Sequence, residues 1–335
     1  MPTQREIVRS AIDHRSTHSV PFHIDVLAPV RARLEEHYGT DDIDQPMGNY
    51  LRWFNASESW ESLGDNLERD EFGVVWATNE FNRGHIVEYT LKNPTLEGYT
   101  FPEFDNRSRF AHIADAAKRD NDKYLVAWTG DLFERACFLR GLDHILMDMK
   151  LHPEFVHELL DRILSIVLAN AEAICEYPVD ALFLSDDYGI QASLMMSPND
   201  WRVFVKPHLA KVVEFVHKNK RKVFLHSCGN VTAILTDLID VGVDVLHPIQ
   251  PEAMDIFEIK REFGDRITLY GGISTQETLR SGTPEDVRLE TKRVVSVLGE
   301  GGGYILGPGI TLQHDIPWDN LLAFIDACQA STTSV

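Results

Sequence analysis

The stretch Lys222-Val-Phe-Leu-His226-Ser-Cys228-Gly229-Asn230-Val231 joins a short apolar run to a histidine and a cysteine that are two residues apart. The apolar run before His226 predicts a buried strand, which ends at the turn signal Gly229-Asn230. Strand side chains repeat every second residue, so His226 and Cys228 point to the same side if the strand geometry continues. An imidazole beside a potential thiolate can form half of a zinc site. The alternative is a packed histidine and a buried cysteine, which are both common in protein cores.

Similar apolar runs recur along the chain and alternate with longer helical patterns. The sequence predicts strands at residues 20–25, 49–55, 124–129, 180–184, 223–225, 243–246, 267–270 and 304–306. Short apolar strands that alternate with helices indicate a parallel sheet. Eight such units in about 300 residues predict a single (β/α)8 TIM barrel domain over residues 1–335. A doubly wound open sheet is the alternative.

Residues 70–91 depart from this rhythm. Phe72 to Trp76 and His85 to Leu91 alternate in polarity around Asn82-Arg-Gly84. Alternation on both sides of a turn predicts a β-hairpin. We expect this hairpin to be an insertion that forms a flap over one end of the domain.

The composition of the 335 residues restricts the class of protein and its partners. Hydrophobic residues make up 44% and charged residues 25%, which is typical of a globular protein. The net charge of −20 argues against nucleic acid or an anionic membrane surface as a partner. Four cysteines without paired spacing, and the lack of a leader or a membrane-spanning apolar run, predict a cytoplasmic protein with reduced thiols.

Polar side chains concentrate at the carboxyl ends of the predicted strands, where α/β barrels hold their active sites. This concentration predicts an enzyme with a small-molecule substrate. The residues assigned to substrate binding are His23, Asp25, Trp128, Tyr188, Gln250 and Gly272. The glycines at these ends either line a substrate floor or simply allow tight turns.

Two adjacent carboxylates, Asp186 and Asp187, follow the predicted strand at 180–184. Adjacent residues on an extended chain point in opposite directions, so at most one of them faces the barrel axis. That carboxylate could accept a proton or bind a metal, or it could cap the next segment. His247 ends another strand, where it is a third metal ligand, a general base or a structural histidine. Asp186, Asp187 and His247 are therefore the candidate catalytic residues.

The chain resembles the uroporphyrinogen decarboxylase superfamily over nearly its whole length. The motifs behind this resemblance are Arg5-Glu-Ile-Val8 with Val20-Pro21, Leu139-Arg-Gly141, Ser185-Asp-Asp-Tyr-Gly189, Ser197-Pro198, His226-Ser-Cys-Gly229, Gly271-Gly-Ile273, and Gly301-Gly-Gly-Tyr-Ile-Leu-Gly-Pro308 with Pro317 and Asn320. The resemblance implies a TIM barrel with a deep polar cleft. In true decarboxylases an Arg-Gln-Ala-Gly-Arg-Tyr loop after the first strand holds the acidic side chains of the tetrapyrrole. Here the same region reads Phe22-His-Ile-Asp-Val-Leu-Ala-Pro29, which contains no arginine.

The chain is therefore more similar to the other branch, the methylcobamide-dependent methyltransferases. This resemblance implies a zinc ion, held by His-x-Cys and a later Cys, that activates a thiol as a thiolate. His226 and Cys228 match the first two ligands, whereas Ile310 stands where the later Cys would fall. Since Ile cannot bind a metal, either another group completes the site or the site is weak or lost. The candidates for the third ligand are His247, Asp186, Asp187 and His314.

Three functions remain open at this point. The first is a zinc-assisted, corrinoid-linked methyltransferase acting between a methylated or methoxylated small molecule, a corrinoid and a thiol or pterin acceptor. The chain has no Asp-x-His-x-x-Gly cobalamin signature, so the corrinoid would come from a separate corrinoid protein or as a free molecule. The second is a decarboxylase or other lyase that acts on a small acid or a porphyrinogen through Asp186 or Asp187 without metal. The third is a barrel that binds a ligand without chemistry.

Overall fold

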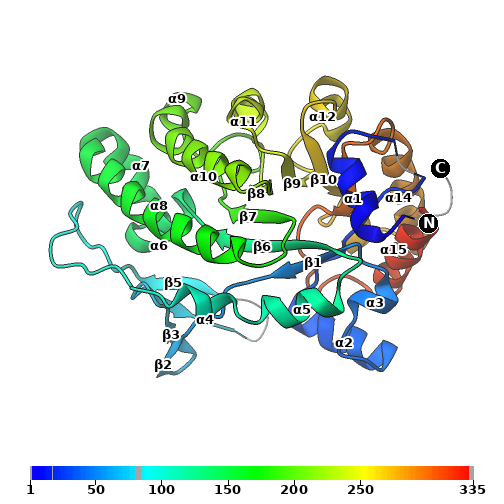
Figure 1. The fold of residues 1–335 in the computed structure, drawn as a ribbon, viewed down its shortest axis with the longest axis horizontal. Helices are drawn as coiled ribbons and strands as arrows, with labels where there is room; N and C mark the ends of the chain where they lie inside the picture. The colour runs from blue at the N-terminus through cyan, green and yellow to red at the C-terminus, as the bar shows by residue number, and fades with distance from the viewer. Residues whose placement is uncertain (1, 17, 80–83, 332–335) are drawn as a thin grey trace.

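The computed structural model describes residues 2–16, 18–79 and 84–331. Seven parallel strands form a curled sheet in the order β1-β6-β7-β8-β9-β10-β11 (Figure 1). The strands are β1 (Leu51–Phe54), β6 (Tyr124–Gly130), β7 (Ala181–Ser185), β8 (Lys222–His226), β9 (Val245–Ile249), β10 (Thr268–Ile273) and β11 (Tyr304–Pro308). Each strand lies beside the next one in chain order, so the predicted α/β barrel architecture is confirmed.

The predicted first strand at residues 20–25 is present only as isolated bridges. Phe22 pairs in parallel with Leu306 of β11, and its carbonyl accepts a hydrogen bond from the Tyr50 amide at 3.0 Å, just before β1. The segment thus lies between the two edge strands of the sheet. Its ladder is short because Pro21 has no amide hydrogen and the Ile24 amide bonds to a side chain, the Asn49 Oδ1, at 2.9 Å.

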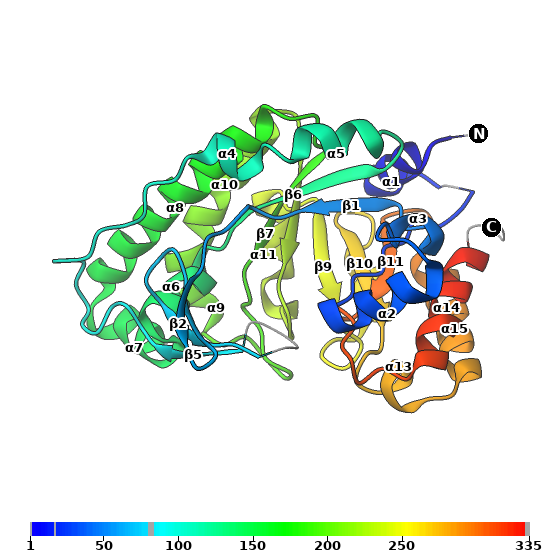
Figure 2. The ribbon, with the colours of Figure 1, turned by 90° about the horizontal axis from the view of Figure 1, so that it is seen from below.

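Helices cover the outside of the sheet (Figures 1 and 2). Those of the first half are α1 (Gln4–Ile12), α2 (Ala28–Tyr38), α3 (Asp44–Met47), α4 (Asn106–Phe110), α5 (Ile113–Arg119), α6 (Phe133–Arg140), α7 (Leu142–Leu151) and α8 (Pro153–Cys175). Those of the second half are α9 (Pro198–Asp200), α10 (Lys206–Lys218), α11 (Leu235–Val241), α12 (Ile256–Phe263), α13 (Thr278–Ser281), α14 (Pro284–Leu298) and α15 (Trp318–Ser331), with a π-helical turn at Trp201–Val205 and a 3₁₀ turn at Thr232–Ile234. None of the described helices is long and apolar enough to cross a membrane.

The core lies between the sheet and these helices. The sheet strands are buried on both faces, and all six residues of β10 are buried, which is why they read as continuous apolar runs rather than as alternating patterns. The long helix α8 packs against β6 and α10. This rigid scaffold fixes the positions of the loops that follow each strand.

An antiparallel sheet of four strands is inserted between β1 and β6 (Figure 2). Its strands are β2 (Glu61–Gly64), β3 (Leu67–Arg69), β4 (Val75–Ala77) and β5 (His85–Glu88). The hairpin predicted near residues 70–91 corresponds to β4 and β5, although Asn82 and Arg83 of its turn lie outside the described residues. The prediction missed β2 and β3, which meet at Asp65-Asn66. Both of these turn residues have positive φ, 50° and 61°, as a two-residue hairpin turn requires.

The inserted sheet is fastened to helix α6, which follows the carboxyl end of β6. Asp70 forms an ion pair with Arg135 at 3.3 Å, and the rings of Trp76 and Phe138 lie 5.1 Å apart. These contacts hold the sheet beside the carboxyl end of the barrel, in agreement with the expected flap.

Candidate functional site

Three potential metal ligands meet where β7 and β8 end. The Sγ of Cys228 lies 3.4 Å from Nε2 of His226, and an Oδ1 of Asp187 lies 3.3 Å from the same nitrogen. The ligand atoms of the three side chains are all within 4.8 Å of one another, and the described residues contain no other such group of histidine, cysteine or acidic side chains. The side chains of His226 and Asp187 are 18% and 30% exposed, so solvent reaches the cluster.

The backbone around Cys228 is held by side chains from neighbouring strands. The Cys228 amide donates to Asp187 Oδ1 at 2.7 Å, and the Gly229 amide donates to Gln250 Oε1 at 2.6 Å. Gly229 has φ +78°, and a Cβ there would lie 2.4 Å from the backbone of Gly189. Only glycine allows this close approach. The turn after β8 is therefore fixed by packing and hydrogen bonds, which keeps the Cys228 thiol at the cluster.

Asp186 and Asp187 point in opposite directions, as expected for adjacent residues of an extended chain. Asp186 is fully buried and accepts hydrogen bonds from the Leu132 and Glu134 amides at 3.2 and 2.7 Å and from the Tyr188 hydroxyl at 2.7 Å. Burial raises the pKa of Asp186 to about 7 in spite of these donors. Burial alone would also raise the pKa of Asp187, but hydrogen bonds from His226 and the Cys228 amide lower it. Asp187, rather than Asp186, is therefore the carboxylate that lies beside His226 and Cys228.

His247 lies behind His226 rather than beside the ligand atoms. The two Nδ1 atoms are 3.0 Å apart. Burial and the charge of His226 lower the pKa of His247 well below its usual value. Burial alone would lower the pKa of His226, but hydrogen bonds to Asp187 and Cys228 raise it to about 10. Neutral His247 therefore accepts a hydrogen bond from His226 Nδ1, which leaves His226 Nε2 directed at Asp187 and Cys228.

His23 belongs to a group of rings beside His247. It is buried, and its Nδ1 lies 2.8 Å from the Tyr270 hydroxyl. The His247 and Tyr270 rings are 4.3 Å apart, and Trp53 lies 6.0 Å from His247. The sequence places Trp53 and Tyr270 in predicted strands but does not assign them to a site. Trp53 is in β1 and Tyr270 is in β10, and the two side chains become neighbours only because the sheet curls.

The remaining predicted substrate-binding residues have different surroundings. Trp128 donates from Nε1 to Asp131 at 3.3 Å, and the exposed Asp25 accepts from the Thr311 hydroxyl at 2.6 Å. Tyr188 is completely buried, and its hydroxyl donates a hydrogen bond to Asp186. A Cβ on Gly272 would lie 3.2 Å from the Tyr304 hydroxyl and 3.3 Å from Val294 of α14, on the helix side of the sheet. The structure therefore does not bring Tyr188 or Gly272 to the cluster.

One further acid, absent from the candidates predicted from the sequence, lies close to the site. Glu134 is in the first turn of α6, directly after the carboxyl end of β6. Burial, with the charges of Asp131, Asp187 and Asp186, raises the pKa of Glu134 to about 9. The sequence signal for Glu134 is its position shortly after a predicted strand end.

The donor atoms of Asp187, His226 and Cys228 fit a zinc ion, since zinc takes carboxylate oxygen, imidazole nitrogen and thiolate sulfur. Of the four third ligands considered from the sequence, the structure brings Asp187 to the pair. Asp186 is fully engaged elsewhere, and His247 is bonded to His226. His314 is exposed and is not among the residues of the cluster.

The chain belongs to the uroporphyrinogen decarboxylase (URO-D) family, whose model matches residues 87–331. Over 174 residues it is 31% identical to the methylcobamide:CoM methyltransferase MtaA of Methanosarcina barkeri, covering 52% of this chain and 48% of that protein. It is 23% identical over 270 residues to the methylated-thiol–coenzyme M methyltransferase of Methanosarcina mazei, covering 79% and 70%. It is 25% identical over 179 residues to the uroporphyrinogen decarboxylase of Psychromonas ingrahamii, covering 52% and 48%.

The chain thus spans about half the length of the first curated relatives that it matches. A solved methyltransferase from Methanosarcina mazei superposes with a TM-score of 0.74 at 18% identity, covering 98% of this chain and 99% of that structure. This superposition supports the fold.

Proposed function

We propose that this chain is a methyltransferase that transfers a methyl group from a methylated corrinoid to a thiol acceptor, with zinc held by Asp187, His226 and Cys228. The convergence of these three side chains at one barrel end is the observation that supports the proposal. The relatives whose names specify methyl transfer from a methylcobamide to coenzyme M point to the same chemistry. A pterin acceptor is the alternative, and a methylated or methoxylated small molecule would be the original methyl source.

The ligand set suits this role in charge as well as in geometry. A zinc ion bound here would lower the pKa of a thiol attached to it, so that the thiol stays a nucleophilic thiolate. The Asp187 carboxylate and the Cys228 thiolate carry two negative charges, the same number as two thiolates would. Asp187 therefore compensates electrostatically for Ile310, which stands where the superfamily pattern has a cysteine.

The other residues orient this set. His247 accepts from His226 Nδ1 and so keeps Nε2 as the ligand nitrogen. Gln250 holds the turn that carries Cys228. The corrinoid would come from a separate corrinoid protein or as a free molecule that docks at the carboxyl end of the barrel.

The test combines metal content with turnover. We expect about one zinc per chain in protein purified without chelator, measured by elemental mass spectrometry, and methyl transfer from methylcobalamin to 2-mercaptoethanol. Cys228→Ser should lose both, with activity reduced at least about a hundredfold. Cys175→Ser is the matched control, since this thiol is partly exposed at the end of α8 and should keep both. A metal-free wild type without methyl transfer would overturn the proposal.

A lyase is the second candidate, and one observation favours it. Asp186 and Glu134, with pKa values raised to about 7 and about 9 by burial, offer two acids that hold protons near neutral pH. A lyase that uses them would keep its activity after chelation. We expect no coproporphyrinogen from uroporphyrinogen, because residues 22–29 carry no arginine to pair with the substrate carboxylates.

A further inference from the structure

A basic pocket lies at the opposite, amino end of the barrel. It is a cavity of about 380 Å³ between α1, the start of β6 and the turns that precede β7 and β8. Its ionisable lining residues are Arg5, Arg9, Asp13, Tyr124, Asp180, Lys220, Arg221 and Lys222. Five cations and two carboxylates line this space, in a chain whose net charge is −20. Such a local surplus of positive charge raises the concentration of anions at the pocket.

Part of this charge is used within the fold. Asp180 accepts from Arg5 Nε at 2.9 Å, from Arg9 at 2.7 Å and from the Leu125 amide at 2.9 Å. One carboxylate therefore serves two guanidinium groups. Lys222 contacts Asp244 at 3.0 Å. These pairs explain how the pocket is built, and they leave the other cations available.

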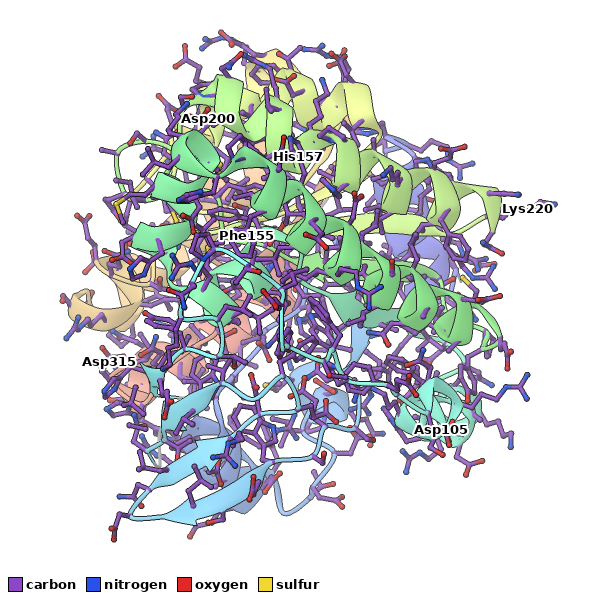
Figure 3. All side chains as sticks on the ribbon, turned by 90° about the vertical axis from the view of Figure 1, so that its left-hand side faces the viewer. Asp105, Phe155, His157, Asp200, Lys220 and Asp315 are labelled. Carbon is purple, nitrogen blue, oxygen red and sulfur yellow. The ribbon has the colours of Figure 1, made fainter. Side chains whose placement is uncertain are left out.

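Lys220 and Arg221 provide this unused charge. Neither has a carboxylate partner among the described residues. Lys220 is exposed, and its φ of +57° belongs to the end of α10, where the Lys220 and Arg221 amides donate to the His217 and Val216 carbonyls at 2.9 and 3.2 Å. Figure 3 shows Lys220 at the outer edge of the molecule, at the turn that follows α10. The Nε of Arg221 is buried without a hydrogen-bond partner, which costs free energy unless an acceptor is supplied.

We propose that this pocket binds a polyphosphate group, such as a di- or triphosphate. Several closely spaced anionic oxygens match both the number of cations and the donor fork of arginine. A single carboxylate would neutralise only one of the surplus charges. Lys222 and His226 are the two ends of β8, about 13 Å apart at strand rise. The polyphosphate site is therefore separate from the cluster at Cys228, and its test does not depend on methyl transfer.

The experiment measures binding of pyrophosphate, inorganic triphosphate and ATP to the full chain by calorimetry, at constant ionic strength and without divalent cations. We expect binding of triphosphate to the wild type and a rise in unfolding temperature of about 2 °C or more at saturation. The Lys220→Gln/Arg221→Gln variant should bind at least about tenfold more weakly. The control variant Lys218→Gln/Lys118→Gln removes the same charge from two exposed lysines outside the pocket and should bind like the wild type.

The results separate the possible sources of the ligand. Equal affinities for triphosphate and ATP support free polyphosphate as the ligand, and tighter binding of ATP supports a nucleotide. No binding above the salt control, or equal losses in both double variants, would overturn the proposal. Circular dichroism checks that the pocket variant folds, and Lys220→Gln alone repeats the test if it does not, since this side chain is exposed.

Discussion

The aspartates at the two ends of β7 show how surroundings decide the role of a carboxylate. Asp180, just before the strand, is 2% exposed and accepts from two arginines and a backbone amide. Asp187, two residues beyond the strand, is 30% exposed and shares its oxygen with His226 and the Cys228 amide. The donors around Asp180 cannot bind a metal, whereas the neighbours of Asp187 include two metal-binding side chains. Asp180 therefore fastens the fold, and Asp187 is available for chemistry.

This comparison predicts the largest effect for the substitution Asp187→Asn, on zinc binding and methyl transfer. The amide oxygen of asparagine can still accept from the Cys228 backbone, so the free energy of unfolding should change by less than about 1 kcal/mol. The lost charge should lower zinc affinity and methyl transfer at least about a hundredfold. Zinc titration and turnover with methylcobalamin measure both effects. A variant that keeps its zinc would remove Asp187 from the ligand set.

Asp180→Asn should behave in the opposite way. It leaves Arg5 and Arg9 facing a neutral group, and we expect a loss of about 2–3 kcal/mol in the free energy of unfolding, since the arginines are partly exposed. Zinc per folded chain should not change. Urea unfolding followed by fluorescence measures the first quantity. If Asp180→Asn lost zinc and Asp187→Asn lost stability, the division between the two ends would be wrong.

Much of the barrel was predictable, because strands buried on both faces have a strong local signal. The runs from Tyr124 onward, such as 124–129 and 304–306, correspond to β6 and β11 with small shifts at their ends. The predicted strand at 20–25 was reduced to bridges, because the side chain of Asn49 takes an amide that the ladder needed. Such competition comes from a residue about 25 positions away and leaves no local pattern.

The site was predictable only in part. The spacing of His226 and Cys228 placed both on one side, and alternation allowed only one of Asp186 and Asp187 to face the site. Which of them does so depends on the amides at Leu132 and Glu134, which bind Asp186. These amides lie at the start of helix α6, more than 50 residues earlier in the chain. Sequence periodicity contains no information about such contacts.

The substitution Ile310→Cys should have a smaller effect, on zinc affinity, and it tests which residues form the metal site. Ile310 follows β11, at the same barrel end as Cys228. A thiolate added there should increase zinc affinity about tenfold, because zinc prefers soft ligands in a four-coordinate site. Competition with a chromogenic chelator measures this affinity. If only the variant bound zinc and methylated a thiol, the natural chain would have lost the site of its relatives and our assignment would fail.

The smallest predicted effect concerns Asp186, the buried neighbour of Asp187. Burial raises the pKa of Asp186 from its usual 3.8 to about 7. Between these values the folded chain binds the proton and the unfolded chain does not, so the contribution of Asp186 to stability is complete below pH 4 and is lost as the pH rises through 7. Relative to Asp186→Asn, wild type should lose stability from pH 5 to 7 with a slope below about 1 kcal/mol per pH unit, since nearby acids share the proton.

Urea unfolding at pH 5, 6, 7 and 8 measures this difference between wild type and Asp186→Asn. The matched control is Asp237→Asn, because hydrogen bonds from Arg202 and Lys206 lower the pKa of Asp237. Asp237 is ionised in both the folded and the unfolded chain throughout this pH range, so its difference from wild type should stay constant. A constant difference for Asp186→Asn as well would mean that Asp186 is already ionised in the folded chain at pH 5. The two adjacent carboxylates would then carry the same charge, and hydrogen bonding rather than protonation would distinguish Asp186 from Asp187.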